Sequence, residues 1–271
     1  MREFLSKLGR KPLVVELTAR LGIHSLLGAI YRFLFAPAGG KHEVCVGGRR
    51  AHFRVYSATA ARALDALGGE RPMLEFLMAR VAQGDCFYDV GSAVGLYTVF
   101  LAQAVGEQGQ VVAFEPQRDV YERLRENVKL NRLRNVQAFR LALGEKDSSA
   151  ILQTAEVAGG GRIVPPGERS PLRSEHVQVA QGDAFIKKQG LPFPRAIKID
   201  VEGHEYSVLS GLSHTLALPC CEFVCCEVHP RLLRPWFDPE AVLGLLRSAG
   251  FADIQVHLRG TDFNAWAVKH R

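Results

Sequence analysis

Residues 86–116 read CFYDVGSAVGLYTVFLAQAVGEQGQVVAFEP, and this stretch decides the fold. It begins with a short apolar run at 86–90 and passes through a glycine-containing turn into an apolar segment at 97–104 that has helical character. A second apolar run at 111–114 ends at Glu115. Strand, tight turn, helix and strand in this order are typical of the nucleotide-binding half of a doubly wound α/β sheet. In such a sheet the ligand lies over the carboxyl ends of the strands.

The spacing of the glycines indicates which ligand the turn holds. A dinucleotide turn has the pattern G-x-G-x-x-G, which lets a pyrophosphate approach the backbone. Here Gly91 is followed by Ala93 and Gly95, and Leu96 stands where the third glycine would be. This shorter pattern favours S-adenosylmethionine (SAM), which has no pyrophosphate. Glu115 lies about 20 residues beyond the turn, where a carboxylate can accept hydrogen bonds from both ribose hydroxyls.

The turn supplies the other predicted contacts to the cofactor. Residues 92–96 form a helix N-terminus, whose N–H groups and dipole favour the carboxylate of SAM. Asp89 is placed to meet the cationic amino group. The predicted cofactor-binding residues are Asp89, Gly91, Ser92, Gly95, Glu115 and Ala142, the last of which follows the third predicted strand.

Apolar runs along the rest of the chain predict one large sheet. The five predicted core strands are 86–90, 111–114, 136–141, 196–201 and 223–228, with helical patterns between them. Two closing runs, 254–258 and 265–269, are joined closely enough to form an antiparallel pair at one edge. Five parallel strands and a terminal hairpin are the plan of class I SAM methyltransferases, whereas ordinary dehydrogenases lack that hairpin. We therefore predict an α/β, Rossmann-like fold with a seven-stranded, mostly parallel sheet and a C-terminal antiparallel hairpin.

Two domains are expected. Residues 1–70 form an N-terminal extension with helices near 12–35 and a β-hairpin around Gly47-Gly48, and residues 71–271 form the SAM-dependent domain. Residues 144–175 are rich in Gly, Pro, Ser and charge, so we expect an insertion loop there. Long loops in compact domains are usually functional or disordered. We expect this loop and the N-terminal extension to shape the pocket for the methyl acceptor.

The positive charge is concentrated in the N-terminal part. The chain has a formal net charge of +6, and residues 1–54 carry ten Lys/Arg against three Asp/Glu. A basic amphipathic segment can lie on an anionic membrane surface. We favour a lid that packs on the domain with its basic side chains toward solvent, and keep peripheral membrane contact as the alternative. A secretory signal ending near residues 36–38 is disfavoured, because charges interrupt the apolar segment before it.

Six cysteines bear on compartment and metal binding. Four of them form the pattern CC-x-x-x-CC at 220–226, which supplies at most half of a zinc site, and the surrounding apolar run favours cysteine as a small buried residue. No disulfide framework is visible, so we expect a cytoplasmic protein. No run of apolar residues is long enough to span a bilayer.

A second chemical cluster lies at residues 196–205, which read AIKIDVEGHE. Strand alternation places Lys198 and Asp200 on one face of a central strand, where both faces are covered. A charged Lys198 therefore needs a carboxylate partner, and Asp200 or Asp89 can serve. The next core strand ends in EVHP, which brings further polar side chains to the same rim. We expect convergence of Asp200, Glu202, Glu227 and His229.

The predicted catalytic residues are Asp200, Glu227 and His229. His229 is the first candidate for the general base, because the unperturbed pKa of histidine lies near neutrality. Asp200 and Glu227 would orient it or the acceptor, and His204 is the second candidate for the base. A divalent metal bound by the acidic cluster is an alternative, because hard cations prefer oxygen ligands. We do not expect one, since no ligand spacing in the sequence demands a metal.

Five motifs occur in order along the chain: DVGSAVGLYT, AFEP, LNRLRNV, KIDVEGHE and EVHP. Together, over residues 70–268, they resemble the FkbM-type SAM-dependent methyltransferases. The resemblance implies a Rossmann-like fold, SAM as methyl donor, and usually O-methylation of a hydroxyl on a sugar, glycolipid or other secondary metabolite. One departure is Ser92-Ala93, where the family often has Ala-Asn, so that a side-chain amide contact to the cofactor is lost.

Other functions remain open from the sequence. They are an NAD(P)-dependent Rossmann oxidoreductase and a non-catalytic SAM-binding or membrane-associated scaffold. A small-molecule, glycan or lipid acceptor is expected. A nucleic-acid substrate is disfavoured, because the chain has no Asn-Pro-Pro-Tyr-type tetrapeptide and its basic segment lacks interleaved aromatic residues for base stacking.

Overall fold

The computed structural model describes residues 40–55, 61, 64–154, 161–164, 173–233 and 238–270. Contacts group the chain into two compact units, one comprising Met1–His42 and Phe53–Gly68 and the other Glu43–His52 and Gly69–Arg271. The large sheet, its helices and the site all lie in the second unit. The helices expected near residues 12–35 lie outside the described residues.

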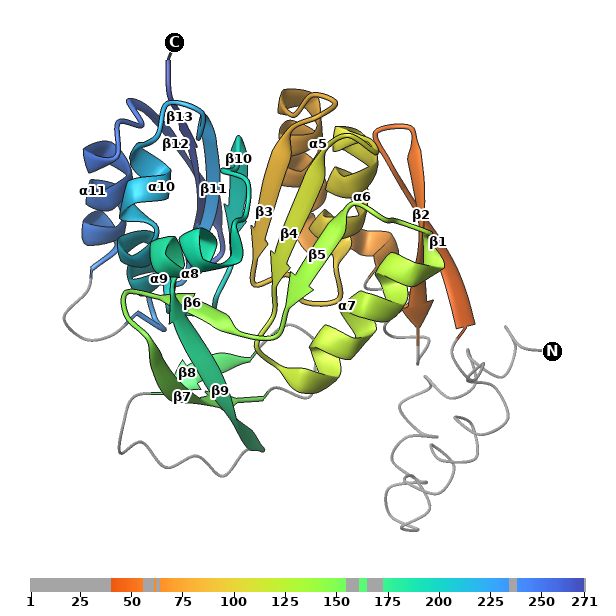
Figure 1. Cartoon of the computed structure of the whole chain (residues 1–271), viewed down its shortest axis with the longest axis horizontal. Coiled ribbons are helices and arrows are strands. Elements are labelled where there is room, and N and C mark those ends of the chain that lie inside the picture. Colours follow the sequence, from red (N-terminus) through yellow and green to blue (C-terminus); the bar gives the residue numbers. More distant parts are fainter. Residues whose placement is uncertain are drawn as a thin grey trace, which may run out of the picture. The chain divides into compact units, whose positions relative to one another are not determined.

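A seven-stranded sheet forms the centre of the second unit (Figure 1). The strand order is β12-β13-β11-β10-β3-β4-β5. The bounds are β3 (Cys86–Val90), β4 (Gln110–Phe114), β5 (Val136–Phe139), β10 (Ala196–Ile199), β11 (Phe223–Val228), β12 (Asp253–Arg259) and β13 (Asp262–Val268). Neighbours from β5 to β11 pair in parallel, and β13 is antiparallel to both β11 and β12. The predicted fold class, including the C-terminal hairpin, is confirmed.

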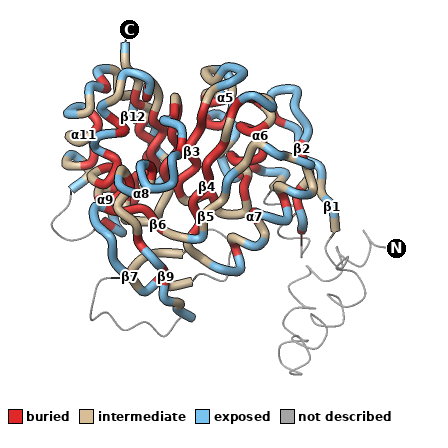
Figure 2. Tube along the Cα trace, in the orientation of Figure 1, coloured by how far each residue is buried: buried red, intermediate tan, exposed pale blue. Residues whose placement is uncertain are grey.

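Helices cover both faces of this sheet, as the fully buried strands β3 and β10 require. Figure 1 shows α5 (Arg71–Arg80), α6 (Leu96–Val105) and α7 (Arg118–Leu130) on one side. On the other side are α8 (Gly182–Gln189), α9 (Glu205–Gly211), α10 (Ser213–Ala217) and α11 (Pro239–Ser248). Buried residues concentrate along the central strands (Figure 2). Within the described residues, no helix combines the length and the apolar character needed to cross a membrane.

A second sheet occupies most of the described part of the segment expected to be an insertion loop. Its order is β6-β9-β7-β8, with bounds β6 (Ala142–Gly144), β7 (Ser148–Gln153), β8 (Arg162–Val164) and β9 (Ser174–Gln181). The expectation of a loop over 144–175 is therefore wrong for the described part of that segment. The Gly and Pro residues that suggested it fall mainly in 155–160 and 165–172, outside the described residues, and they obscured the short strands beside them.

The predicted hairpin around Gly47-Gly48 is confirmed as β1 (Gly40–Val46) and β2 (Arg49–Val55). Both glycines have positive φ, 55° and 76°, which suits the tight turn of a two-residue hairpin. The backbone of His52 exchanges hydrogen bonds with the side chain of Asn131 at the end of α7, at 2.8 and 2.7 Å. This part of the hairpin is thereby joined to the large domain.

Candidate active site

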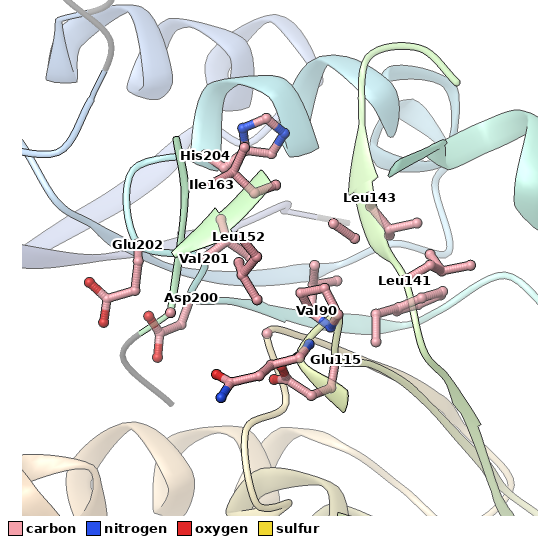
Figure 3. Close-up of a pocket in the computed structure, with 16 residues that line it drawn as sticks. Val90, Glu115, Leu141, Leu143, Leu152, Ile163, Asp200, Val201, Glu202 and His204 are labelled. Atoms are coloured by element: carbon pink, nitrogen blue, oxygen red, sulfur yellow. The ribbon is translucent and has the colours of Figure 1, made fainter. Parts of the chain in front are cut away.

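A cavity lies where the carboxyl ends of β3, β4 and β10 meet the second sheet. In Figure 3, Asp200 and Glu202 lie on one side, Leu141 and Leu143 lie on the other, and Glu115 lies between them. The position agrees with the rule that ligands of open α/β sheets bind beyond the carboxyl ends of the strands. The cavity therefore presents a carboxylate edge and an apolar edge to one ligand.

Gly91 lies at the floor of the cavity, where the chain after β3 closely approaches the chain after β10. Its φ is +76°, and a Cβ atom built on it would lie 1.8 Å from the backbone oxygen of Asp200. Its N–H donates to the carbonyl of Phe114 at 3.0 Å, as does the N–H of Ser92. Only glycine fits this conformation and this close approach. The turn after β3 is thus fixed against the ends of both neighbouring strands.

Glu115 follows β4 and faces the cavity, as predicted. Its carboxylate accepts hydrogen bonds from the N–H groups of Ala93 and Gln117, each at 2.9 Å. Burial raises the pKa of Glu115 to about 7, although these two backbone hydrogen bonds lower it. Each carboxylate oxygen has a second lone pair, so the group can still accept hydrogen bonds from a ribose.

This pKa predicts that SAM binds more weakly in mild acid. The ionised carboxylate is the better acceptor for ribose hydroxyls, and about a tenth of it remains ionised one pH unit below its pKa. We expect the dissociation constant of SAM, measured by calorimetry, to rise by up to about tenfold between about pH 8 and about pH 6. Glu115→Gln, the matched control, reports the titration of the cofactor alone and should show a flatter dependence. Equal pH dependence in both proteins would contradict the assignment.

The six predicted cofactor residues fall into two groups. Gly91, Glu115 and Ala142 line the cavity, whereas Asp89, Ser92 and Gly95 do not. Asp89 is fully buried and accepts a hydrogen bond from the Thr98 hydroxyl at 2.5 Å. Ser92 is also buried, and its hydroxyl donates to the carbonyl of Phe114 at 3.1 Å.

Gly95 has a packing role at the start of α6. Its φ is +89°, and a Cβ atom there would lie 2.5 Å from Leu124 Cδ1 on α7. The turn is thus supported from outside the cavity by Asp89, Ser92 and Gly95. The sequence pattern identified the turn, but it did not distinguish the residues that line the cavity from those that support the turn.

The apolar edge contains residues that sequence reasoning missed. Leu141 and Leu143 come from the segment after β5, and Leu152 and Ile163 come from β7 and β8 of the second sheet. Such a slot suits a flat apolar ring system such as adenine. The expectation that residues 144–175 help to shape the acceptor pocket covered Leu152 and Ile163, and no expectation covered Leu141 and Leu143.

The cavity lining fits SAM better than a dinucleotide. Glu115, Asp200 and Glu202 contribute carboxylates, and no lysine or arginine is among the described residues that line the cavity. A pyrophosphate would meet only like charge there, whereas SAM carries a cationic sulfonium and ammonium. A ribose-facing carboxylate, an apolar slot and a cationic ligand are therefore mutually consistent.

Polar side chains converge at the carboxylate edge, as predicted. His229 Nε2 lies 3.9 Å from Asp200 Oδ1 and 3.6 Å from Glu202 Oε2. Lys198 Nζ lies 3.6 Å from Asp200 Oδ2 and 3.6 Å from Asp89 Oδ1. Both carboxylates named as partners for Lys198 are confirmed.

His229 is held by a residue that sequence reasoning passed over. Its Nδ1 is hydrogen-bonded at 2.7 Å to Oε1 of Glu205, which is fully buried. Burial lowers the pKa of His229, but the hydrogen bond and charge of Glu205, with the charges of Asp200 and Glu202, raise it to about 9. The imidazole therefore carries a proton at neutral pH. Glu205 is the last residue of the KIDVEGHE motif, and this motif was the sequence signal that could have identified it.

Glu227 lies at the same rim but is held by a cation. Arg259 Nη1 donates to both carboxylate oxygens of Glu227, at 3.0 and 2.9 Å, and to Glu70 at 2.7 Å. Burial and the charge of Asp200 raise the pKa of Glu227 to about 7, against the lowering effect of Arg259. Glu227 does not line the cavity, so its carboxylate supports the rim next to Asp200.

Comparisons with known proteins agree with this geometry. A family profile described as "Methyltransferase FkbM domain" matches residues 89–252, more than half of the chain. The hexuronic acid methyltransferase AglP of Haloferax volcanii is 29% identical over 204 residues, which are 75% of this chain and 79% of that protein. Methyltransferase 1 of Beauveria bassiana is 25% identical over 142 residues, which are 46% of this chain and 57% of that protein.

Two solved structures resemble the chain more distantly. Methyltransferase FkbM from Methylobacillus flagellatus is 18% identical, with a TM-score of 0.46, and the match covers 69% of this chain and 44% of that one. An rRNA methylase from Streptococcus thermophilus is 12% identical, with a TM-score of 0.48 and coverage of 74% and 96%. The family match spans the glycine turn, Glu115 and the acidic strand ends. The chain belongs to the FkbM methyltransferase domain family and is a SAM-dependent methyltransferase.

Proposed function

We propose that the chain methylates a hydroxyl group of a sugar or sugar-containing metabolite. The observation that carries the proposal is that Asp200 lines the same cavity as Gly91 and Glu115. A carboxylate at the acceptor end of a cofactor cavity can take the proton that a hydroxyl loses on methylation. The hexuronic acid methyltransferase among the relatives supports a sugar as the class of acceptor.

The chain contributes alignment and proton removal. When bound, SAM supplies a methyl group that its sulfonium has already activated. Holding an acceptor oxygen in line with that group can account for about 7–11 kcal/mol of the barrier. Asp200, whose side chain is partly exposed, accepts the hydroxyl proton, and the acceptor oxygen keeps the electron pair that forms the new bond.

His229 has a different role in this proposal from the one the sequence suggested. A base must be unprotonated before the reaction, and a pKa of about 9 keeps His229 protonated at neutral pH. Its imidazolium faces Asp200 and Glu202 and orients both carboxylates. Glu227, held by Arg259, fixes the adjacent part of the rim.

The test uses the full chain with methyl-tritiated SAM and p-nitrophenyl glycosides of glucose, rhamnose and glucuronic acid. Transfer to at least one glycoside is expected, and the label should survive mild alkali, because an ether at a hydroxyl is stable. Alkali-labile label would indicate a methyl ester of the glucuronic carboxylate and would contradict hydroxyl methylation. Tight SAM binding without transfer to any sugar or lipid-linked sugar would favour the non-catalytic scaffold.

No divalent metal is expected to take part. Asp200, Glu202 and His229 offer ligand atoms within 4.8 Å of one another, which is the arrangement of a candidate cation site. The proton on His229 supplies positive charge at this position and neutralises part of the carboxylate charge. We therefore expect kcat to be unchanged after dialysis against EDTA. Loss of activity that Mg²⁺ or Mn²⁺ restores would show that a metal replaces this proton.

A further inference from the structure

Lys198 is a buried lysine on the central strand β10. Its side chain is 3% exposed, and strand pairing places it opposite Asp89 on β3. A buried ammonium costs stability unless carboxylates and hydrogen bonds compensate for lost hydration, and an apolar residue is often at least as stable there. Stability alone therefore does not explain why this position carries a charge.

The contacts of Lys198 join the two halves of the site. Its Nζ donates to the backbone carbonyl of Gly91 at 2.6 Å, which fixes the turn on the cofactor side. The same atom lies 3.6 Å from Asp200 Oδ2 on the acceptor side. It also lies 5.3 Å from the centre of the Tyr97 ring on α6, which limits its movement. One ammonium group thus bridges the cofactor turn and the acceptor carboxylate.

The charge of Lys198 is maintained in this environment. Burial lowers its pKa, but the carboxylates of Asp200 and Asp89, with Glu70 and Glu227 further away, outweigh this and raise it. Asp89 in turn is fixed by the hydroxyl of Thr98 in α6. The ammonium therefore remains charged at neutral pH. Lys198 is on β10, its ammonium pairs with Asp89 on β3, and Asp89 in turn is bonded to α6.

We propose that Lys198 is a positioning residue that holds the carboxylate of Asp200 at a fixed distance from the glycine turn. The inference rests on the proposed role of Asp200 as proton acceptor. A misplacement of about 1 Å at a reacting group can cost about 100-fold in rate. Without Lys198, Asp200 retains His229 as its nearest cation in the described site, and that contact is longer.

The test is a double-mutant cycle with Lys198→Met, Asp200→Asn and both together. The readouts are kcat with tritiated SAM and the p-nitrophenyl glycoside that is turned over fastest, and the SAM dissociation constant from calorimetry. We expect Lys198→Met to lower kcat by about 100-fold and to weaken SAM binding through the loosened turn. The double variant should be no slower than Asp200→Asn alone, because Lys198 acts through Asp200.

Lys269 provides the matched control. Its Nζ also donates to backbone carbonyls, those of Leu216 and Leu218, but it lies at the far end of β11 and β13, away from the cavity. Lys269→Met should lower the melting temperature and leave kcat and SAM binding unchanged. The proposal would be overturned if Lys269→Met, at a similar loss of stability, lost as much kcat as Lys198→Met.

The remaining outcomes distinguish the positioning role of Lys198 from the proton-accepting role of Asp200. Losses that multiply in the double variant would overturn the role of Lys198 alone. Full activity in Asp200→Asn would instead overturn the proposed function of Asp200. If Lys198→Met does not fold, because Asp89 is left buried without its cation, the cycle is repeated in an Asp89→Asn background. In that background, adding Lys198→Met to Asp200→Asn must again cause no further loss of kcat.

Discussion

Gly91→Ala is expected to destabilise the protein by more than about 4 kcal/mol and to abolish SAM binding. The added Cβ would lie 1.8 Å from the backbone oxygen of Asp200 and 2.9 Å from its carbonyl carbon. That segment cannot move aside easily, because the N–H of Asp200 donates to the carbonyl of Val90 at 3.0 Å and continues the β3–β10 pairing. Urea unfolding and calorimetry with SAM measure the two effects.

Gly48→Ala is a matched control for this change. Gly48 has the same φ of +76°, but no atom lies within 4 Å of a Cβ built there. This variant should therefore show only the cost of a left-handed conformation, about 1–2 kcal/mol, and should bind SAM normally. The difference between the variants measures the close approach of β3 to Asp200. If Gly91→Ala were no less stable than Gly48→Ala and still bound SAM, the tight junction would be disproved.

Continuous apolar runs made the large sheet predictable. The run at 223–228 coincides with β11, and the run at 86–90 coincides with β3, because strands covered on both faces contain almost no polar residues. The close spacing of the last two runs indicated the antiparallel hairpin of β12 and β13. These features depend on local composition, which a single sequence contains.

The second sheet and the charge state of the site were not predictable in the same way. Strand β7 is mostly exposed or half-buried and its apolar run covers only residues 150–152, and β8 has only three residues. The proton on His229 depends on Glu205, Asp200 and Glu202 being brought together, and such long-range contacts change a pKa that composition alone sets near neutrality. The pairing of Arg259 with Glu70 spans 189 positions of the chain.

Asp200→Asn is expected to lower kcat by about 10²–10⁴-fold, the usual contribution of a positioned acid or base. Asparagine has nearly the same size and shape as aspartate and fits between Lys198 and His229, but it cannot accept a proton. The SAM dissociation constant should change far less than kcat, because Glu115 and the glycine turn provide the contacts predicted for the cofactor. Single-turnover methyl transfer to the glycoside acceptor, with calorimetry for SAM, separates the two quantities.

The control for this prediction is Asp119→Asn, which removes an exposed carboxylate from the first turn of α7. It changes the net charge by the same amount and should leave kcat unaltered. Glu202→Gln is the more demanding comparison, because Glu202 also lines the cavity and faces His229. If general negative charge at the rim were sufficient, Glu202→Gln and Asp200→Asn would lose activity equally. A loss confined to Asp200→Asn indicates that the position of one oxygen, beside Lys198 and at the end of β10, determines the proton transfer.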